Sequence, residues 1–268
     1  EKQQSGLVLI PDDFKFYKKI DVLIDSRSNF GDMVKSGFKA LVELNEWTNP
    51  NLNPRGTLLK ILGEKGLHES EMQSIIFDKG IDYNFPENIE NEAQKIEISE
   101  NKKEIDEKLK NRKDFRNVST FTIDPLDAKD FDDALSYEEI DQNKIRVGVH
   151  IADVSYFVRE DTSLDKEARK RSFSTYLVDR TIPMLPEVLS NNLCSLMPNM
   201  DRCAFSAVFL IEKNTGKVLD RWFGRTLINS NKRFSYEEAQ EILESRIKNY
   251  ELCMILNSIF IIHFLCSI

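Results

Sequence analysis

The stretch DPLDAKDFDDAL, residues 124–135, carries the densest chemical signal in this sequence. It places five aspartates within ten residues, namely Asp124, Asp127, Asp130, Asp132 and Asp133. Carboxylates this close together repel one another, and in a partly dry site each pair costs on the order of 1 kcal/mol. We therefore expect the segment either to lie in solvent as an acidic loop or to fold around cations.

Two simpler interpretations of this stretch do not fit. A calcium-binding loop needs an oxygen ligand at position five and glycine at position six. Counting from Asp130 puts Ala134 and Leu135 at those positions. A solvated loop has little reason to place Phe131 and Leu126 between the aspartates. A metal site built into a folded core accounts for both the acidic and the apolar residues.

The donor set indicates which ion is expected. All candidate ligands are oxygens, which favours the hard cations Mg²⁺ or Mn²⁺. Two such ions about 4 Å apart form the usual clamp for phosphodiester hydrolysis, in which one activates water and the other stabilises the leaving oxygen. From the residues alone, three alternatives stay open: metal-dependent phosphoryl chemistry, a structural ion site, and no site.

The surrounding sequence predicts mixed α/β structure over residues 116–250. Residues 144–151, KIRVGVHI, alternate between apolar and other side chains, which is typical of a strand with one buried face. The segments 205–211 and 217–228 flank NTG and predict a hairpin. Helices are predicted for residues 163–172 and for the segment opened by the capping box Ser235–Glu238.

The first part of the chain has a different pattern. Residues 1–65 carry short apolar runs separated by turn residues, and these runs are 7–10, 20–24, 38–44 and 57–62. Such spacing predicts a small β-barrel of the oligonucleotide/oligosaccharide-binding (OB) type. Residues 66–115 are charged and helix-prone and are predicted to form a helical linker. The expected fold class is therefore α+β.

Composition sets broader limits. The 268 residues are 41% hydrophobic and 31% charged, which predicts a packed core rather than global disorder. The net charge of −8 disfavours a non-specific polyanion binder, although local patches matter more than the total. The four cysteines lack metal-site spacings and are expected to be reduced, as in a cytosolic protein. For the apolar run 252–268, a buried segment, a non-native ending and a membrane span are the alternatives.

Three blocks of sequence closely resemble the ribonuclease II/ribonuclease R family of 3′-to-5′ exoribonucleases. They are DPLDAKDFDDA at 124–134, VGVHIADVSYFV at 147–158 and IPMLPEVLSNNLCSL at 182–196. The resemblance leans towards ribonuclease R. It implies a cold-shock-type barrel followed by the N-terminal part of an RNB-type catalytic domain. It also implies a fragment, because the family's catalytic domain continues beyond this chain.

The resemblance also implies roles for individual residues. Asp124, Asp130, Asp132 and Asp133 are expected to hold Mg²⁺, with Mn²⁺ as the alternative, and Asp132 is expected to matter most for the chemical step. Tyr176 is expected to stack on the 3′-terminal base, since every base offers a π-face. The densest basic run could contact RNA phosphates or form a solvated helix face, and the residues we assign to RNA binding are Arg169, Lys170, Arg171 and Arg180.

His150 and Asp153 suggest a catalytic pair, but side chains three apart on a strand point to opposite faces, which favours structural roles. The expected function is Mg²⁺-dependent hydrolysis of single-stranded RNA to 5′-mononucleotides. The alternative is a non-catalytic RNA-binding fragment. Single-stranded RNA is the expected partner, with the ribosome or RNA-decay factors as protein partners. We further expect a cytoplasmic monomer without membrane association.

Overall fold

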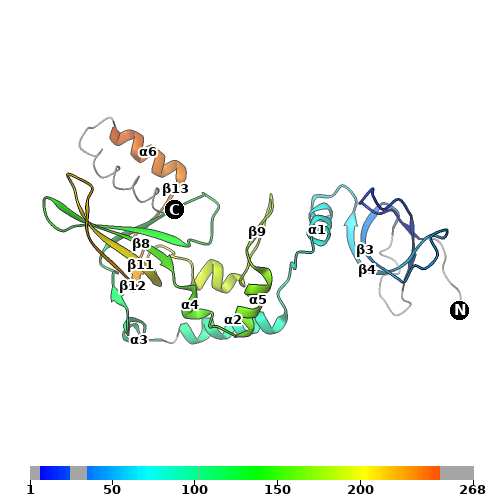
Figure 1. The fold of residues 1–268 in the computed structure, drawn as a ribbon, viewed down its shortest axis with the longest axis horizontal. Coiled ribbons are helices and arrows are strands. Elements are labelled where there is room, and N and C mark those ends of the chain that lie inside the picture. The colour runs from blue at the N-terminus through cyan, green and yellow to red at the C-terminus, as the bar shows by residue number, and fades with distance from the viewer. Residues whose placement is uncertain (1–6, 25–34, 102, 248–268) are drawn as a thin grey trace. The chain divides into compact units, whose positions relative to one another are not determined.

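The computed structural model describes residues 7–24, 35–101 and 103–247, and the chain divides into two units, Glu1–Asn84 and Phe85–Ile268 (Figure 1). Both units contain helices and a largely antiparallel sheet, so the predicted α+β class is confirmed. The apolar run 252–268 lies outside the described residues. None of the helices in the described part of the chain is long and apolar enough to cross a membrane.

The first unit is built on a four-stranded sheet with the order β1-β2-β4-β3. Its elements are β1 Val8–Leu9, β2 Ile20–Leu23, β3 Phe38–Leu44, β4 Arg55–Glu64 and the helix α1 His68–Asp78. β2 and β4 run parallel, and the other two pairs are antiparallel. The predicted strands are therefore present. Over the described residues they form an open sheet and not the closed barrel that we expected.

One glycine sets how closely two strands of this sheet approach. A Cβ atom at Gly56 would lie 2.9 Å from the carbonyl oxygen of Glu43 and still closer to the Val42 side chain. β3 and β4 therefore need a residue without a side chain at position 56.

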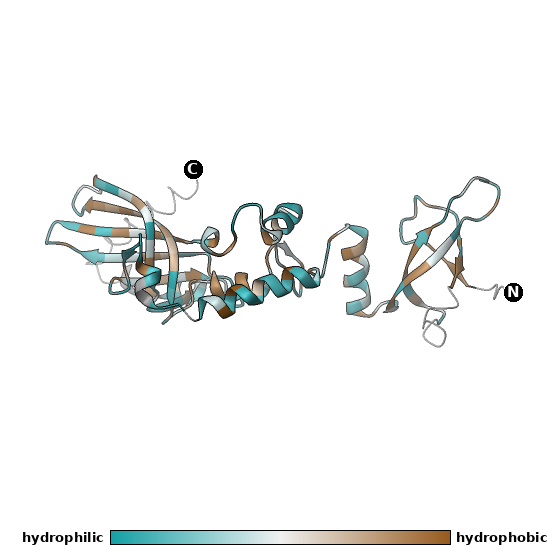
Figure 2. Ribbon diagram, turned by 90° about the horizontal axis from the view of Figure 1, so that it is seen from below, coloured by the Kyte–Doolittle hydropathy of each residue, from teal (hydrophilic) through white to brown (hydrophobic). Residues whose placement is uncertain are grey.

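The second unit is built on a seven-stranded sheet with the order β13-β6-β7-β8-β11-β12-β5. Its strands are β5 Lys113–Asp114, β6 Ser119–Asp124, β7 Asp133–Glu139, β8 Lys144–Ala152, β11 Asp201–Glu212, β12 Val218–Asn229 and β13 Lys232–Ser235. A separate two-stranded sheet pairs β9 Thr175–Tyr176 with β10 Thr181–Ile182. The predicted strand at 144–151 and the hairpin around residues 213–217 are confirmed. Figure 2 shows hydrophilic and hydrophobic residues alternating along these strands.

Helices pack against this sheet in the described part of the unit. They are α2 Glu87–Glu100, α3 Ile105–Leu109, α4 Val154–Phe157, α5 Ser163–Arg171, the π-helix η1 Val188–Leu193 and α6 Tyr236–Ile247. The main core joins Ala204 and Val208 of the sheet to Leu164 of α5 and Leu189 of η1. The predicted capping box is confirmed, since the Glu238 backbone N–H donates to Ser235 Oγ (3.1 Å) and the Ser235 N–H donates to Glu238 Oε2 (2.9 Å). α6 contacts β13, beside which it lies in Figure 1.

The boundary between the units differs from the expected linker at 66–115. Helix α2 presents Ile89, Ala93 and Ile96 on one face, at a spacing of one and two turns, and all three pack in the core of the second unit. The chain therefore divides at residues 84 and 85, and α1 belongs to the first unit. The charged residues between these apolar positions gave the segment the composition of a linker.

Candidate active site

The acidic loop, residues 124–133, joins two neighbouring strands of the large sheet. Asp124 is the last residue of β6 and Asp133 is the first residue of β7. Because the two strands are antiparallel neighbours, the end of β6 and the start of β7 lie at the same end of the sheet. The loop therefore returns to its starting point, which brings carboxylates from its two ends near one another.

Ser195 holds the second half of the acidic loop. Its Oγ accepts a hydrogen bond from the Phe131 backbone N–H (3.0 Å) and donates to the Lys129 carbonyl oxygen (3.0 Å). The backbone N–H of Leu196 donates to the Phe131 carbonyl oxygen (2.8 Å). Phe131 itself is buried in the main core. These contacts fix the backbone on both sides of Asp130.

The carboxylates of the loop experience one another's charge. Burial raises the pKa of Asp124, and the charges of Asp133 and Asp130 raise it further, against the opposite effects of Thr122 and Arg233. Partial desolvation also raises the pKa of Asp132, and the charges of Asp130, Asp133 and Asp124 add to this shift.

Desolvation likewise raises the pKa of Asp133. A group of carboxylates with raised pKa values favours the binding of protons or cations, which relieves both the repulsion and the desolvation.

The oxygen donors suit a hard divalent cation. Asp124 is buried, and its Oδ2 is shielded from solvent without a hydrogen bond of normal geometry, although the Thr122 hydroxyl lies close enough to lower the pKa of Asp124. Such an orphaned acceptor needs a donor or a cation. Among the described residues, however, no three acidic, histidine or cysteine side chains are already arranged to hold an ion. Like charges repel, so the carboxylates would turn towards a shared cation only when it binds.

Tyr176 lies beside this loop. The residue belongs to β9, and 69% of its surface is exposed. Desolvation raises the pKa of the Tyr176 hydroxyl, and the nearby charges of Asp130 and Asp132 raise it further. The Tyr176 hydroxyl thus lies near enough to Asp130 and Asp132 to feel their charge, and the stacking of Tyr176 on a terminal base stays a prediction.

Three of the predicted RNA-binding residues already form ion pairs. The Arg169 guanidinium contacts Asp165 (3.0 Å), and that of Arg180 contacts Asp179 (2.6 Å). Arg171 pairs with Glu167 (2.9 Å), and its guanidinium lies 3.7 Å from the centre of the Phe85 ring. With its side chain only 6% exposed, Arg171 packs helix α5 against the start of the unit. Lys170 is exposed on α5.

His150 does not pair with Asp153. Its ring is fully buried, with Nδ1 2.6 Å from Ser206 Oγ and Nε2 2.8 Å from Ser136 Oγ. Burial lowers the pKa of His150 to about 4, so the ring is neutral at pH 7. A Cβ atom at position 148 would lie 2.7 Å from His150 Nε2, so Gly148 leaves room for the ring.

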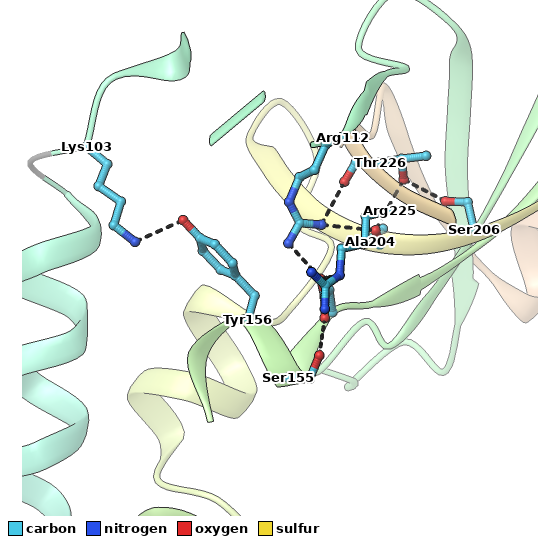
Figure 3. Close-up of polar contacts among 9 residues, drawn as sticks. Lys103, Arg112, Ser155, Tyr156, Ala204, Ser206, Arg225 and Thr226 are labelled. Atoms are coloured by element: carbon cyan, nitrogen blue, oxygen red, sulfur yellow. Dashed lines mark hydrogen bonds and ion pairs between the residues drawn. The ribbon is translucent and has the colours of Figure 1, made fainter. Parts of the chain in front are cut away.

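Asp153 forms a buried ion pair with Arg112. The Arg112 Nη2 donates to Asp153 Oδ2 (2.6 Å), and its Nη1 lies 3.3 Å from both the Ala204 and the Thr226 carbonyl oxygens (Figure 3). Ser155 Oγ donates to Asp153 Oδ1 (2.7 Å). Burial acts to raise the pKa of Asp153, but these hydrogen bonds outweigh it and hold that pKa below its usual value. The predicted structural roles of His150 and Asp153 agree with this geometry.

Sequence reasoning missed Arg233 of β13, which lies in register with Thr122 on the parallel strand β6. Its Nη2 donates to the carbonyl oxygens of Pro125 (2.6 Å) and Leu126 (2.7 Å), at the start of the acidic loop. A lone arginine next to a capping box carries no local signal of such a contact. Only the parallel pairing of β13 with β6, across more than 100 residues of chain, brings it there.

Comparison with known families bears on both units. Residues 112–256 match the RNB domain family, and residues 9–86 match a cold shock domain family. The chain is 40% identical over 216 residues to DIS3-like exonuclease 2 of Xenopus tropicalis, which covers 79% of this chain and 25% of that protein. It is 39% identical over 224 residues to ribonuclease R of Thermotoga maritima, covering 82% of this chain and 31% of that protein.

Two further similar proteins are a relative named as inactive and a solved structure bound to RNA. A protein of Arabidopsis thaliana named inactive exonuclease DIS3L2 is 50% identical over 141 residues, covering 53% of this chain and 13% of that protein. The structure of Mycoplasma genitalium RNase R in complex with ribose-methylated single-stranded RNA superposes with a TM-score of 0.71 at 26% identity, covering 89% of this chain and 36% of that one.

The chain thus spans about a third or less of the length of these relatives. The acidic loop, Tyr176 and Arg233 all lie within the segment matched by the family, and the resemblance expected from the sequence is confirmed. The chain belongs to the RNB domain family, and its first unit is of the cold shock type.

Proposed function

We propose that this chain carries the first part of the catalytic core of a 3′-to-5′ exoribonuclease, which hydrolyses single-stranded RNA to 5′-mononucleotides with Mg²⁺ or Mn²⁺. The observation that supports this most is the acidic loop. It gathers carboxylates of raised pKa around Asp124, whose buried Oδ2 has no hydrogen-bond partner.

Each residue of the site would have a separate role in the reaction. Asp124, Asp130, Asp132 and Asp133 would hold the divalent cation, which supplies the charge that activates water and stabilises the leaving oxygen. Tyr176, exposed beside the loop, would stack on the terminal base and hold the last phosphodiester next to the carboxylates. Ser195 would keep the loop backbone in place through its two hydrogen bonds.

RNA as the substrate is supported by the relatives named as exonucleases or ribonuclease R and by the neighbour solved with single-stranded RNA. The basic residues stay candidates for phosphate contact, and two of them, Arg169 and Lys170, are exposed on α5. The cytoplasmic location, the monomeric state and the ribosome or RNA-decay factors as partners stay predictions from the sequence.

A non-catalytic RNA-binding role is the second candidate. It is favoured by the share of the relatives' length that the chain spans. The 50% identity to the relative named as inactive does not decide between the candidates, because the relative named DIS3-like exonuclease 2 of the same organism is equally identical. In that case the chain would bind single-stranded RNA without shortening it, and divalent cations would not change the length of the bound RNA.

Metal-dependent trimming of a 3′-hydroxyl RNA tests both candidates. We expect Asp132→Asn to lower the trimming rate by on the order of 100-fold, because a lost ligand weakens a metal site at least as much as a lost supporting contact does. Asp127→Asn is the matched control, since Asp127 is exposed in the same loop and is not among the four proposed ligands. Equal rates for wild type and Asp132→Asn would contradict the assignment, and binding without trimming would favour the second candidate.

A further inference from the structure

The side chain of Arg233 contacts the acidic loop at two separate points. Its Nη2 donates to the carbonyl oxygens of Pro125 and Leu126, directly after Asp124. Its guanidinium also lies over the Phe131 ring, 5.0 Å from the ring centre and directly before Asp132. One side chain therefore bridges the beginning and the end of the loop.

The backbone explains how Arg233 comes to lie there. β13 runs parallel to β6, which places Arg233 opposite Thr122 and Ser235 opposite Asp124. The capping box at Ser235 ends β13 and starts α6, so the register of the strand is fixed at its last residue.

The same pair of strands holds the unpaired polar atoms of the structure. Within the described residues, the buried side-chain atoms without a hydrogen-bond partner are Thr122 Oγ1, Asp124 Oδ2 and Arg233 Nε. Buried polar groups in folded proteins are nearly always paired. These three atoms, of which the Thr122 hydroxyl interacts with Asp124, therefore mark a place beside the loop where further polar partners can bind.

We propose that Arg233 is a positioning residue of the acidic loop, which clamps residues 125–126 to β13 and Phe131 to the core. The clamp fixes the loop backbone, so that Asp124, Asp130, Asp132 and Asp133 need only turn their side chains to share a cation. Its metal-binding consequence rests on the proposed function. The clamp itself does not, because the contacts join protein atoms only.

An arginine suits this role for a physical reason. Its planar guanidinium can donate to two carbonyl oxygens and stack on an aromatic ring at the same time. A lysine could make the hydrogen bonds but would not stack as a plane. We therefore expect Arg233→Lys to restore part of the function of the clamp and Arg233→Met to abolish it.

The charge of Arg233 allows a sharp test. A positive charge near the carboxylates opposes the binding of a cation, so loss of this charge alone would strengthen metal binding. Loss of the clamp would weaken binding, because the loop backbone that carries the carboxylates would no longer be held in one conformation. The two interpretations predict opposite signs for Arg233→Met.

The experiment measures Mn²⁺ binding and hydrogen exchange on the full chain, with Arg221→Met as the control because Arg221 is exposed on β12. For Arg233→Met we expect on the order of 10-fold weaker Mn²⁺ binding and 10-fold faster amide exchange over residues 126–131, with unchanged exchange in β11. Arg233→Lys should fall between this variant and the wild type. Tighter Mn²⁺ binding, unchanged loop exchange, or equally faster exchange in β11 would each overturn the proposal.

The two proposals fail in different ways. If the wild type binds no Mn²⁺ and trims no RNA, the proposed function fails, and the hydrogen exchange of the loop still decides whether Arg233 acts as a clamp. If the wild type binds Mn²⁺ and Arg233→Met leaves both the affinity and the loop exchange unchanged, only the clamp fails.

Discussion

Two clusters of polar residues lie next to each other in the large sheet, and they behave in opposite ways. One is the acidic loop, and the other is the His150–Asp153 corner at the end of β8. The backbone N–H of Ala152 donates to the Asp132 carbonyl oxygen (2.9 Å), so the two clusters share a backbone contact. From its residue types alone, the corner looks the more catalytic of the two, because it contains a histidine and an aspartate.

The difference lies in whether each polar group has a partner. Both ring nitrogens of His150 and both carboxylate oxygens of Asp153 are hydrogen-bonded, and Arg112 balances the charge of Asp153. In the acidic loop, burial and like charges raise the pKa of Asp124 and Asp132, and one buried oxygen has no partner. A satisfied network stabilises the fold, whereas an unsatisfied one indicates a binding or catalytic function.

The largest effect on stability is expected at the corner. Asp153→Ala leaves the Arg112 guanidinium buried without its counter-charge, since only 4% of that side chain is exposed. We expect the free energy of unfolding of the second unit to fall by about 3–5 kcal/mol. Urea denaturation followed by Trp222 fluorescence in a Trp47→Phe background would measure this, because the chain has two tryptophans and Trp222 belongs to the second unit.

Two controls distinguish the loss of a buried counter-charge from the loss of an ordinary, partly exposed ion pair. Glu138→Ala breaks the partly exposed ion pair with Arg146 and should cost no more than about 1 kcal/mol. Adding Arg112→Met to Asp153→Ala should recover part of the lost stability, because the unpaired charge is removed. Equal losses for Asp153→Ala and Glu138→Ala would mean that the corner is not the satisfied buried network described above.

The pH dependence of stability comes next in size. Burial lowers the pKa of His150 to about 4 from an ordinary value of 6.5, so the unfolded chain binds a proton at this residue where the folded chain does not. The contribution of His150 is therefore complete above pH 6.5 and is lost as the pH falls towards 4, by about 3 kcal/mol in total.

Denaturation curves between pH 4 and pH 7 for wild type and His150→Asn would measure this loss. The difference in stability between the two proteins should shrink as the pH falls. A difference that is constant over this range would show that His150 is not buried in its neutral form.

Substitution of an aspartate in the acidic loop should raise the free energy of unfolding, whereas substitution of Asp153 lowers it. The raised pKa of Asp132 means that its ionised form is less favourable in the folded than in the unfolded chain. This penalty is present above the folded-state pKa and disappears as the pH falls through that pKa towards the unfolded value. At pH 7, Asp132→Asn should therefore increase the free energy of unfolding, by no more than about 1 kcal/mol because Asp132 is exposed to solvent.

This increase in the free energy of unfolding of Asp132→Asn should appear only in the absence of divalent cations. In excess Mn²⁺ a loaded wild type gains stability from binding, and the order of the two proteins should reverse. A destabilised Asp132→Asn in metal-free buffer would mean that Asp132 serves the fold in the way that Asp153 does.

Sequence reasoning succeeded where the signal was local. The alternation at 144–151, the hairpin and the capping box at Ser235 each depend on residues a few positions apart. The acidic loop is recognisable from its density of aspartates. Sequence reasoning also predicted structural roles for His150 and Asp153, although Asp153 lies between the end of β8 and the start of α4 and not on the strand itself.

The contacts that hold the site together join distant parts of the chain and left no such signal. Ser195 reaches Phe131 across 64 positions, and Arg233 reaches Pro125 across 108. The helical segments expected within 66–115 are present, but the division of the chain after residue 84 was not predicted, for a related reason. The apolar stripe of α2 is narrow, and only the tertiary core reveals what Ile89 and Ala93 pack against.

The smallest effect on stability is expected at Tyr176, which should matter for binding alone. Because 69% of its surface is exposed, Tyr176→Ala should change the free energy of unfolding by less than about 0.5 kcal/mol. Loss of a stacked base should weaken the binding of a single-stranded RNA by about 1–3 kcal/mol, measured by fluorescence anisotropy, and Tyr176→Phe should bind as the wild type does. Phe223→Ala, at another exposed aromatic residue, is the control. If Tyr176→Ala and Phe223→Ala weaken RNA binding equally, exposure of an aromatic ring accounts for the effect, and the place of Tyr176 beside the acidic loop does not.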